Sequence, residues 1–433
     1  MLYTLLSCPS AALCAQYHFI TGKANYTMAT TENLQPRKVY LDNAATTRVF
    51  TEVVDEMIPY FVEDYGNPSS LYDFGQREKD AITDARKRIA GHINARAQDI
   101  YFTSCGTESD NWALKATADA YKAKGRHLIT SSIEHHAIKH SMEWLETQGF
   151  EVTYLPVDSY GLVNPADLES ALRPDTTLVS IIHGNNEIGT IQPIKELAAI
   201  AHSHGALFHT DAVQSVAHTP IDVEDLGVDM LSSSAHKFHG PKGVGFLYIR
   251  KGVKSRSFMH GGDQERRRRA GTENVPYIMG MAKAMDMCMA NLDERIAQMR
   301  ELRDYLIERV MAEVEHVRLN GHPTQRLANN VSFCFEFVEG ESLLLSLDHE
   351  GIMASSGSAC ASGSLDPSHV LLAIGLPHEI AHGSLRLSLG EDTTREEIDY
   401  TIEVIKAVIV KLRKMSPLYE DFLLGKKPIS AIK

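Results

Sequence analysis

One lysine of this chain stands in an unusual setting. Residues 232–245 read SSSAHKFHGPKGVG, so that histidines, glycines and small residues surround Lys237. Apolar runs lie on both sides of the stretch, and we therefore expect the lysine to be partly buried. Burial disfavours the ammonium form, and the neutral amine can form a Schiff base with a carbonyl compound. On the lysine alone, a lysine in a polar turn is the better explanation of the stretch, so a second residue must decide.

A carboxylate upstream of the lysine provides that second residue. The apolar run 206–208 leads into HTDAVQS, which contains Asp211. A lysine and a carboxylate at neighbouring strand ends are what pyridoxal phosphate requires. The lysine binds the aldehyde, and the carboxylate keeps the ring nitrogen protonated so that the ring accepts electrons. Asp211 alone would suit a helix N-cap. Together with Lys237, it favours the cofactor.

The elements around these residues alternate between two kinds. Helix-period segments separate most of the apolar, β-type runs, and this pattern predicts an α/β fold with a doubly wound, mainly parallel sheet. Ligands of such sheets bind beyond the carboxyl ends of the strands. We predict strands at 100–103, 127–130, 152–157, 178–183, 206–209, 230–232 and 244–249, and helices at 76–92, 108–123, 136–148, 165–172 and 194–204.

Further polar residues follow other strands of this predicted sheet. Gly106 precedes a predicted helix, where backbone N–H groups can approach a phosphate, and Thr107 with Asp110 matches a capping pattern. An ordinary capped helix explains them equally well. His135 could lie over a cofactor ring and move protons near neutral pH, although such a motif alone more often gives a surface histidine. Asn186 could donate a hydrogen bond to the cofactor's phenolic oxygen.

The last third of the chain has a different organisation. A long helical pattern at 280–315 predicts a connector into a second, smaller domain. Residues 351–365 read GIMASSGSACASGSL, and such a loop offers little packing around Cys360. We expect a mobile, exposed thiol that can act as a nucleophile, with a bystander thiol as the alternative. His378 and His382 match the zinc protease pattern HExxH. Because Pro377 and Gly383 leave room only for a short helix, we expect no metal there.

The composition excludes several classes of protein. The net charge of −13 argues against general nucleic-acid or membrane-surface binding, and the four arginines at 266–269 suit a salt-bridged loop. Six cysteines without CxxC spacing favour neither a disulfide framework nor a zinc ribbon, so we expect a reducing, cytoplasmic setting. No apolar run approaches the roughly 18 residues of a membrane span. We expect residues 1–36 to be a disordered tail or an over-extended start.

With these pieces in place, the chain resembles the cysteine desulfurases of the NifS/IscS type, in the class V aminotransferase family. The resemblance runs from Tyr40 to about Leu418 and depends on YLDNAATT, GNPSS, FTSCGTESDN, NNEIGTIQPI, HTDAVQS, SSAHKFHGPKGVG, RRAGTEN and SSGSACASGSLDPSHV. It implies a fold-type I homodimer with a large cofactor domain, residues 49–294. Residues 37–48 and 295–433 would form a smaller α+β domain that carries the cysteine loop.

The resemblance also implies roles for single residues. Lys237 would bind pyridoxal phosphate, Asp211 would contact the ring nitrogen, and His135 would stack on the ring. Arg386 would hold the substrate carboxylate, and Cys360 would take the sulfur. Asn186 and Gln214 would contact the phenolic oxygen, while the phosphate would be bound by Gly106, Thr107, Ser234 and His236, and by Thr272 of the other subunit.

The implied reaction converts L-cysteine to L-alanine and leaves the sulfur as a persulfide on Cys360. An iron–sulfur scaffold protein or another acceptor would then take it, and Cys360 could briefly contact a nascent cluster. The alternatives are a selenocysteine lyase, an aminotransferase or a non-catalytic scaffold on the same fold. The Cys360 loop argues against an aminotransferase, and the intact set of Lys237, Asp211, His135 and Cys360 argues against a scaffold.

Overall fold

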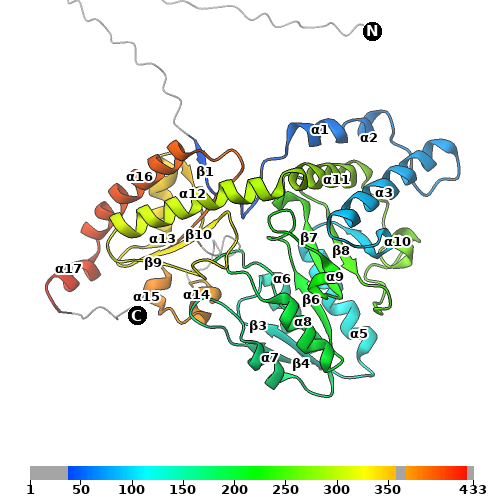
Figure 1. The fold of residues 1–433 in the computed structure, drawn as a ribbon, viewed down its shortest axis with the longest axis horizontal. Helices are drawn as coiled ribbons and strands as arrows, with labels where there is room; N and C mark the ends of the chain where they lie inside the picture. Colours follow the sequence, from blue (N-terminus) through cyan, green and yellow to red (C-terminus); the bar gives the residue numbers. More distant parts are fainter. Residues whose placement is uncertain (1–37, 357–366, 427–433) are drawn as a thin grey trace, which may run out of the picture. The chain divides into compact units, whose positions relative to one another are not determined.

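The computed structural model describes residues 38–356 and 367–426, and its largest element is a seven-stranded sheet (Figure 1). The strand order is β2-β8-β7-β6-β5-β3-β4. β8 alone runs opposite to the other six strands, so the prediction of a mainly parallel sheet is confirmed. The strands are β2 Ile100–Thr103, β3 His127–Ser131, β4 Glu151–Leu155, β5 Thr176–Ser180, β6 Leu207–Asp211, β7 Met230–Ser234 and β8 Gly245–Ile249.

Both faces of this sheet are covered, as a doubly wound fold requires. Successive strand residues point to opposite faces. Accordingly, Leu128 and Leu178 pack into one apolar cluster, whereas the adjacent Ile129 and Val179 pack into another. The helices and turns of this part are α1 Thr51–Met57, α2 Pro59–Val62, α3 Asp73–His92, η1 Ala97–Asp99, α4 Gly106–Asn111, η2 Trp112–Ala116, α5 Thr117–Tyr121, α6 His136–Thr147, α7 Pro165–Ala171, α8 Ile194–Ser203, α9 Val223–Leu226, η3 Ala235–Lys237, α10 Gln264–Arg267 and α11 Val275–Ala290.

The start of α4 differs from the prediction. The helix begins at Gly106, and Cys105 occupies the N-cap position without a side-chain capping bond. Thr107 therefore lies inside the first turn, and the proposed Thr107–Asp110 cap is wrong. Asp110 is instead 1% exposed and faces a cavity, because tertiary packing places that side of the helix against the sheet. The predicted helix 108–123 is also interrupted by the π-helical turn η2.

A second sheet is antiparallel and has the strand order β12-β10-β9. Helices of the last third of the chain pack against this sheet and form a separate apolar cluster with it. The predicted helix at 280–315 is two helices, α11 and α12, which meet at Asn291. The domain boundaries at 49 and 295 stay a prediction. The remaining elements are β1 Val39–Tyr40, α12 Leu292–Glu313, β9 Val317–Leu319, β10 Asn330–Phe335, α13 Gly340–His349, β11 Ile352–Met353, α14 His369–Ala373, α15 His378–Ala381, β12 Ser384–Ser388, α16 Arg395–Lys414 and α17 Pro417–Leu423.

Two smaller expectations can be checked directly. The HExxH stretch forms only the short helix α15, and both of its histidines are exposed, as Pro377 and Gly383 predicted. Across residues 38–356 and 367–426, no helix combines the length and the apolar character that crossing a membrane would take.

Candidate active site

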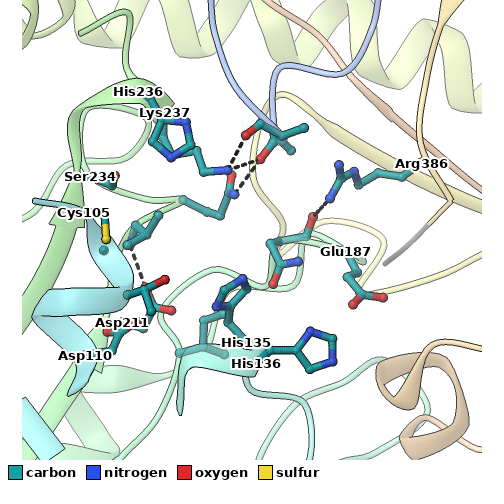
Figure 2. Close-up of a pocket in the computed structure, with 18 of the residues that line it drawn as sticks. Cys105, Asp110, His135, His136, Glu187, Asp211, Ser234, His236, Lys237 and Arg386 are labelled. Atoms are coloured by element: carbon teal, nitrogen blue, oxygen red, sulfur yellow. Dashed lines mark hydrogen bonds between the residues drawn. The ribbon is translucent and has the colours of Figure 1, made fainter. Parts of the chain in front are cut away.

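A cavity of about 300 Å³ lies beyond the carboxyl ends of the parallel strands (Figure 2). Loops after β2, β3, β5, β6 and β7 contribute to it, and so does β12 of the small sheet. The cavity therefore gathers residues that are far apart in sequence. Ten of the predicted site residues line it: Gly106, Thr107, His135, Asn186, Asp211, Gln214, Ser234, His236, Lys237 and Arg386.

Lys237 ends the 3₁₀ turn η3, which directly follows β7. Its side chain is partly buried, as its setting predicted. The ammonium nitrogen donates hydrogen bonds to the carbonyl oxygens of Ala44 and Ala45, at 2.6 and 2.7 Å. These contacts bring the segment after β1 to the cavity and hold the amine at its wall.

Asp211 is the last residue of β6 and is 3% exposed. Its Oδ1 accepts a hydrogen bond from the backbone N–H of Val213 at 2.9 Å. Burial raises the pKa of Asp211 to about 6, while the Val213 N–H and the positive charge of Lys237 act in the opposite direction. At pH 7 the side chain is therefore mainly a carboxylate.

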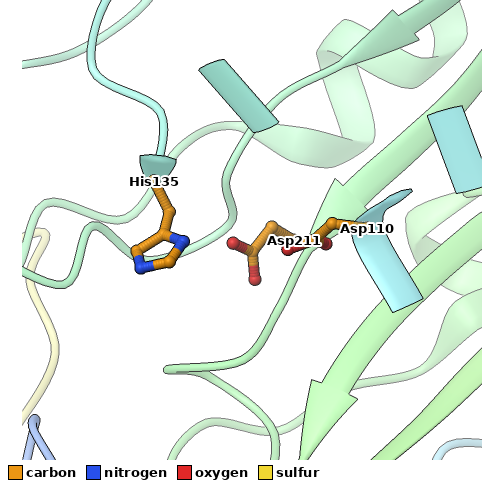
Figure 3. A group of neighbouring side chains, drawn as sticks. All are labelled: Asp110, His135 and Asp211. Atoms are coloured by element: carbon orange, nitrogen blue, oxygen red, sulfur yellow. The ribbon is translucent and has the colours of Figure 1, made fainter. Parts of the chain in front are cut away.

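Asp110 lies beside Asp211 (Figure 3), and both residues line the cavity. Burial, and then the charge of Asp211, raise the pKa of Asp110 well above its usual value. One ligand atom from each of Asp110, Asp211 and His135 lies within 4.8 Å of the other two. Such a trio could hold a cation, but a cation would leave the polar groups on the opposite side of the cavity unexplained.

His135 occupies the N-cap position of α6. Its Nδ1 accepts a hydrogen bond from the backbone N–H of Ala137 at 3.1 Å. Burial, and then the charge of Lys237, lower the pKa of His135 to about 4. The imidazole is therefore neutral at pH 7, and because Nδ1 is the acceptor, the proton sits on Nε2.

Arg386 comes from β12 of the small sheet and is 2% exposed. Its Nη2 donates to Oδ1 of Asp42 at 2.8 Å, and its Nη1 donates to the backbone oxygen of Asn186 at 3.0 Å. Its Nε has no partner within the described ranges. A buried guanidinium with unused donors suits a planar anion such as a carboxylate.

The side of the cavity near β7 carries neutral donors. The Ser234 hydroxyl is buried and has no hydrogen-bond partner among residues 38–356 and 367–426. Burial, and then the charge of Lys237, lower the pKa of His236 to about 4, and His236 Nδ1 lies 3.2 Å from Oγ1 of Thr46. Gln214 Nε2 donates to the Ala44 carbonyl oxygen at 2.9 Å.

These residues fit pyridoxal phosphate. Buried polar groups are normally hydrogen-bonded, so the orphaned atoms of Ser234, Arg386 and Asp110 indicate a polar ligand. Gly106 lets the backbone of α4 approach Val213 closely, because a Cβ at this position would lie 2.7 Å from Cγ2 of Val213. The lysine and the carboxylate that the cofactor needs face the same space.

Two predicted residues are not among those that line the cavity. Thr272 is exposed and lines a separate hollow with Glu265 and Arg269. Cys360 lies outside the described residues. The described chain on either side of it reaches the site, since Ser355 pairs with Arg386 and His369 lines the cavity.

Sequence reasoning missed five cavity residues with polar or ionisable side chains: Cys105, Asp110 as a cavity group, His136, Glu187 and His369. Each of them is a direct neighbour of a predicted residue or belongs to the same motif. Their position next to predicted residues could have indicated them. Only the tertiary structure shows which of these neighbouring residues line the cavity.

Comparisons with known proteins agree with this geometry. The profile of the aminotransferase class-V family matches residues 39–401. A cysteine desulfurase IscS from Methanosarcina thermophila is 58% identical over 388 residues, which are 90% of this chain and 95% of that protein. A solved structure of a NifS-like protein superposes with a TM-score of 0.82 at 41% identity and covers 87% of this chain and 100% of its own. The structure of SspA in complex with cysteine gives a TM-score of 0.73 at 36% identity and covers 82% and 100%.

Proposed function

Because the chain belongs to the class V aminotransferase family, and within it to the cysteine desulfurases, we propose that it removes sulfur from L-cysteine and releases L-alanine. The family depends on pyridoxal phosphate. The observation that carries the proposal is the cavity in which Lys237, Asp211, His135 and Arg386 meet. These four side chains supply a Schiff-base amine, a buried carboxylate, a neutral imidazole and a guanidinium.

When bound, pyridoxal phosphate supplies an aldehyde and a ring that accepts electrons from the substrate Cα. Lys237 would hold the aldehyde, and Asp211 would face the ring nitrogen with its carboxylate. The side chains of Asn186 and Gln214 would contact the phenolic oxygen. Gly106, Thr107, Ser234 and His236 would hold the phosphate, and the unpartnered Ser234 hydroxyl is one donor for it.

Arg386 orients the substrate. Its unused N–H groups bind the carboxylate of cysteine and so fix the orientation of the substrate in the cavity. The bonds to Asp42 and to the Asn186 backbone hold the guanidinium plane before substrate arrives, so little rotational freedom is lost on binding.

His135 moves protons. Its imidazole is neutral and presents Nε2 to the cavity, where it is placed to protonate the carbon fragment left after the sulfur departs or to deprotonate the incoming thiol. The Ala137 N–H keeps Nδ1 in place, so the ring presents Nε2 to the cavity throughout.

Cys360 accepts the sulfur. Its thiolate attacks the substrate sulfur, so that a Cys360 S–S bond forms while the substrate Cβ–S bond breaks. The product is a persulfide on Cys360. Support comes from both flanks of the loop, because Ser355 pairs with Arg386 and His369 lines the cavity. An iron–sulfur scaffold protein or another sulfur acceptor, such as a tRNA-thiolation relay, would then remove the sulfur in the cytoplasm.

The active form is a homodimer. Thr272 is exposed in the single chain, and in a dimer it would reach the phosphate of the partner's cofactor. Large apolar side chains on α1, α2 and the turns after them are also exposed, which is typical of a surface that a second copy covers. They are Val54, Ile58, Phe61, Val62, Tyr65, Leu71 and Tyr72.

The Cys360→Ser variant tests the function. Serine keeps the size of the side chain but is a far weaker nucleophile at pH 7. The variant should bind pyridoxal phosphate with a normal absorbance spectrum and still shift that spectrum on addition of cysteine. It should form no alanine, no sulfide and no persulfide detectable by mass spectrometry.

Cys14→Ser is the matched control and should keep full activity. Alanine production by Cys360→Ser at the rate of the parent chain would remove Cys360 from the mechanism. It would also favour another activity on this scaffold.

A further inference from the structure

Cys105 is the one cysteine among residues 38–356 and 367–426 that is not buried. It follows β2 and lines the same cavity as Lys237 and Ser234 (Figure 2). By contrast, Cys288 and Cys334 are 1% and 0% exposed, and burial raises the pKa of each thiol to about 12. Of the described thiols, Cys105 is therefore the one that a reagent entering the cavity meets.

The backbone holds Cys105 at a fixed point of the wall. Its carbonyl oxygen accepts hydrogen bonds from the N–H of Ser109 at 3.1 Å and from the Thr103 hydroxyl at 3.3 Å. On the sheet side, a Cβ at Gly245 would lie 3.1 Å from the Cys105 carbonyl carbon, so the two backbones are in close contact. The residue cannot withdraw from the cavity without opening this packing.

The sulfur itself is weakly engaged. The hydrogen bond found for it in the described chain is a 3.7 Å contact from the Ser104 hydroxyl. Next to it, the cavity carries two buried oxygen atoms without a hydrogen-bond partner among residues 38–356 and 367–426, the Ser234 hydroxyl and Oδ1 of Asp110, although His209 Nε2 lies 3.8 Å from the latter. These orphaned atoms are independent evidence that a polar ligand belongs beside the thiol.

We propose that Cys105 is a modification site that bound pyridoxal phosphate shields, and that modification of Cys105 in the empty cavity blocks cofactor loading. The proposal rests on the proposed function, since it takes the Ser234 side of the cavity as the place of the phosphate. The bound cofactor would cover the thiol and so limit the access of a reagent to it.

Low-molecular-weight disulfides are the natural class of reagent. The Cys105 thiolate attacks one sulfur of glutathione disulfide, a Cys105–glutathione S–S bond forms, and the original S–S bond breaks. One glutathione thiolate leaves and takes up a proton. The attached tripeptide would lie beside Ser234, on the side of the cavity that the phosphate of the cofactor needs. A thiol reductant reverses the reaction. Cofactor loading would therefore depend on the ratio of thiols to disulfides in the cell.

The test uses the full chain with and without pyridoxal phosphate. Both forms are treated with N-ethylmaleimide, and labelling of each cysteine is followed by peptide mapping in a mass spectrometer. We expect Cys105 to react at least about tenfold more slowly in the loaded protein, because thiol reactivity depends on access and on thiolate fraction. Cys288 and Cys334 should stay unlabelled in both forms, which confirms that the fold is intact.

Cofactor uptake is then measured by absorbance after treatment of the empty protein with glutathione disulfide. Uptake should be lost, and dithiothreitol should restore it. The matched variant Cys105→Ala should take up pyridoxal phosphate equally well before and after the same treatment.

Each contrary result is informative. Equal labelling rates with and without cofactor refute the shielding. Undiminished uptake by glutathionylated protein, or an equal loss of uptake in Cys105→Ala, refutes the block at Cys105. If the untreated chain takes up no pyridoxal phosphate, the proposed function itself fails and this proposal fails with it.

Discussion

Replacing Arg386 by lysine separates substrate binding from every other role of the cavity. Lysine keeps the positive charge, so the partly exposed carboxylate of Asp42 still has a cation beside it. It cannot reproduce the planar fork of the guanidinium, whose Nη1 and Nη2 are positioned by Asn186 and Asp42. The substitution therefore removes the two-pronged contact to the substrate carboxylate and leaves the remaining site in place.

The size of the effect follows from the contact that is lost. A hydrogen bond to a charged group contributes about 1.5–3 kcal/mol, and Arg386 is 2% exposed, so water screens the contact little. That range corresponds to an increase in KM for cysteine of about 10- to 150-fold, since each 1.4 kcal/mol is a factor of ten. Because the contact exists before and during the reaction, kcat should change much less than KM.

Steady-state alanine formation at increasing cysteine concentration measures both constants, and the cofactor absorbance of the variant should be normal. Asp42→Asn is the matched control. It keeps the guanidinium in the cavity and a neutral bond to Nη2, so KM should change by less than about threefold. An unchanged KM in Arg386→Lys, or an equal rise in both variants, would show that Arg386 does not bind the substrate carboxylate directly.

Three further predictions follow from the site. Lys237→Ala should lose turnover and the cofactor adduct that borohydride traps on the wild-type chain; a trapped adduct in the variant would exclude Lys237. Thr272→Ala should lose cofactor faster on dialysis, and mixed dimers with Lys237→Ala should recover activity; mixed dimers no more active than their parents would argue against shared sites. Burial lowers the pKa of His183 to about 4, so the unfolded state binds its proton below pH 6.5 while the folded state does not. The stability that neutral His183 contributes is thus complete above pH 6.5 and is lost toward pH 4. His183→Gln should show a shallower fall of Tm over that range, and an equally steep fall would contradict the sign.

Much of the fold could be predicted because its signals are local. Strands that are buried on both faces are short runs of apolar and small residues. The runs at 100–103 and 127–130 could therefore be located within a residue or two. The roles expected of Lys237 and Asp211 were also local inferences, since each follows a strand of a sheet whose carboxyl edge binds ligands.

What the tertiary structure decided involves residues that are far apart in sequence. β8 runs antiparallel to both of its partners, β2 and β7. The alternation of strands and helices along the sequence does not predict this direction. The ion pair between Arg386 and Asp42 joins residues 344 positions apart. Local rules also failed where packing opposed them, because Asp110 matched a helix cap but is buried and lines the cavity. The sequence by itself determined which chemical groups the chain carries and which elements they follow. The close approach of these groups depends on contacts between segments that are far apart in the chain, and no local pattern predicts those contacts.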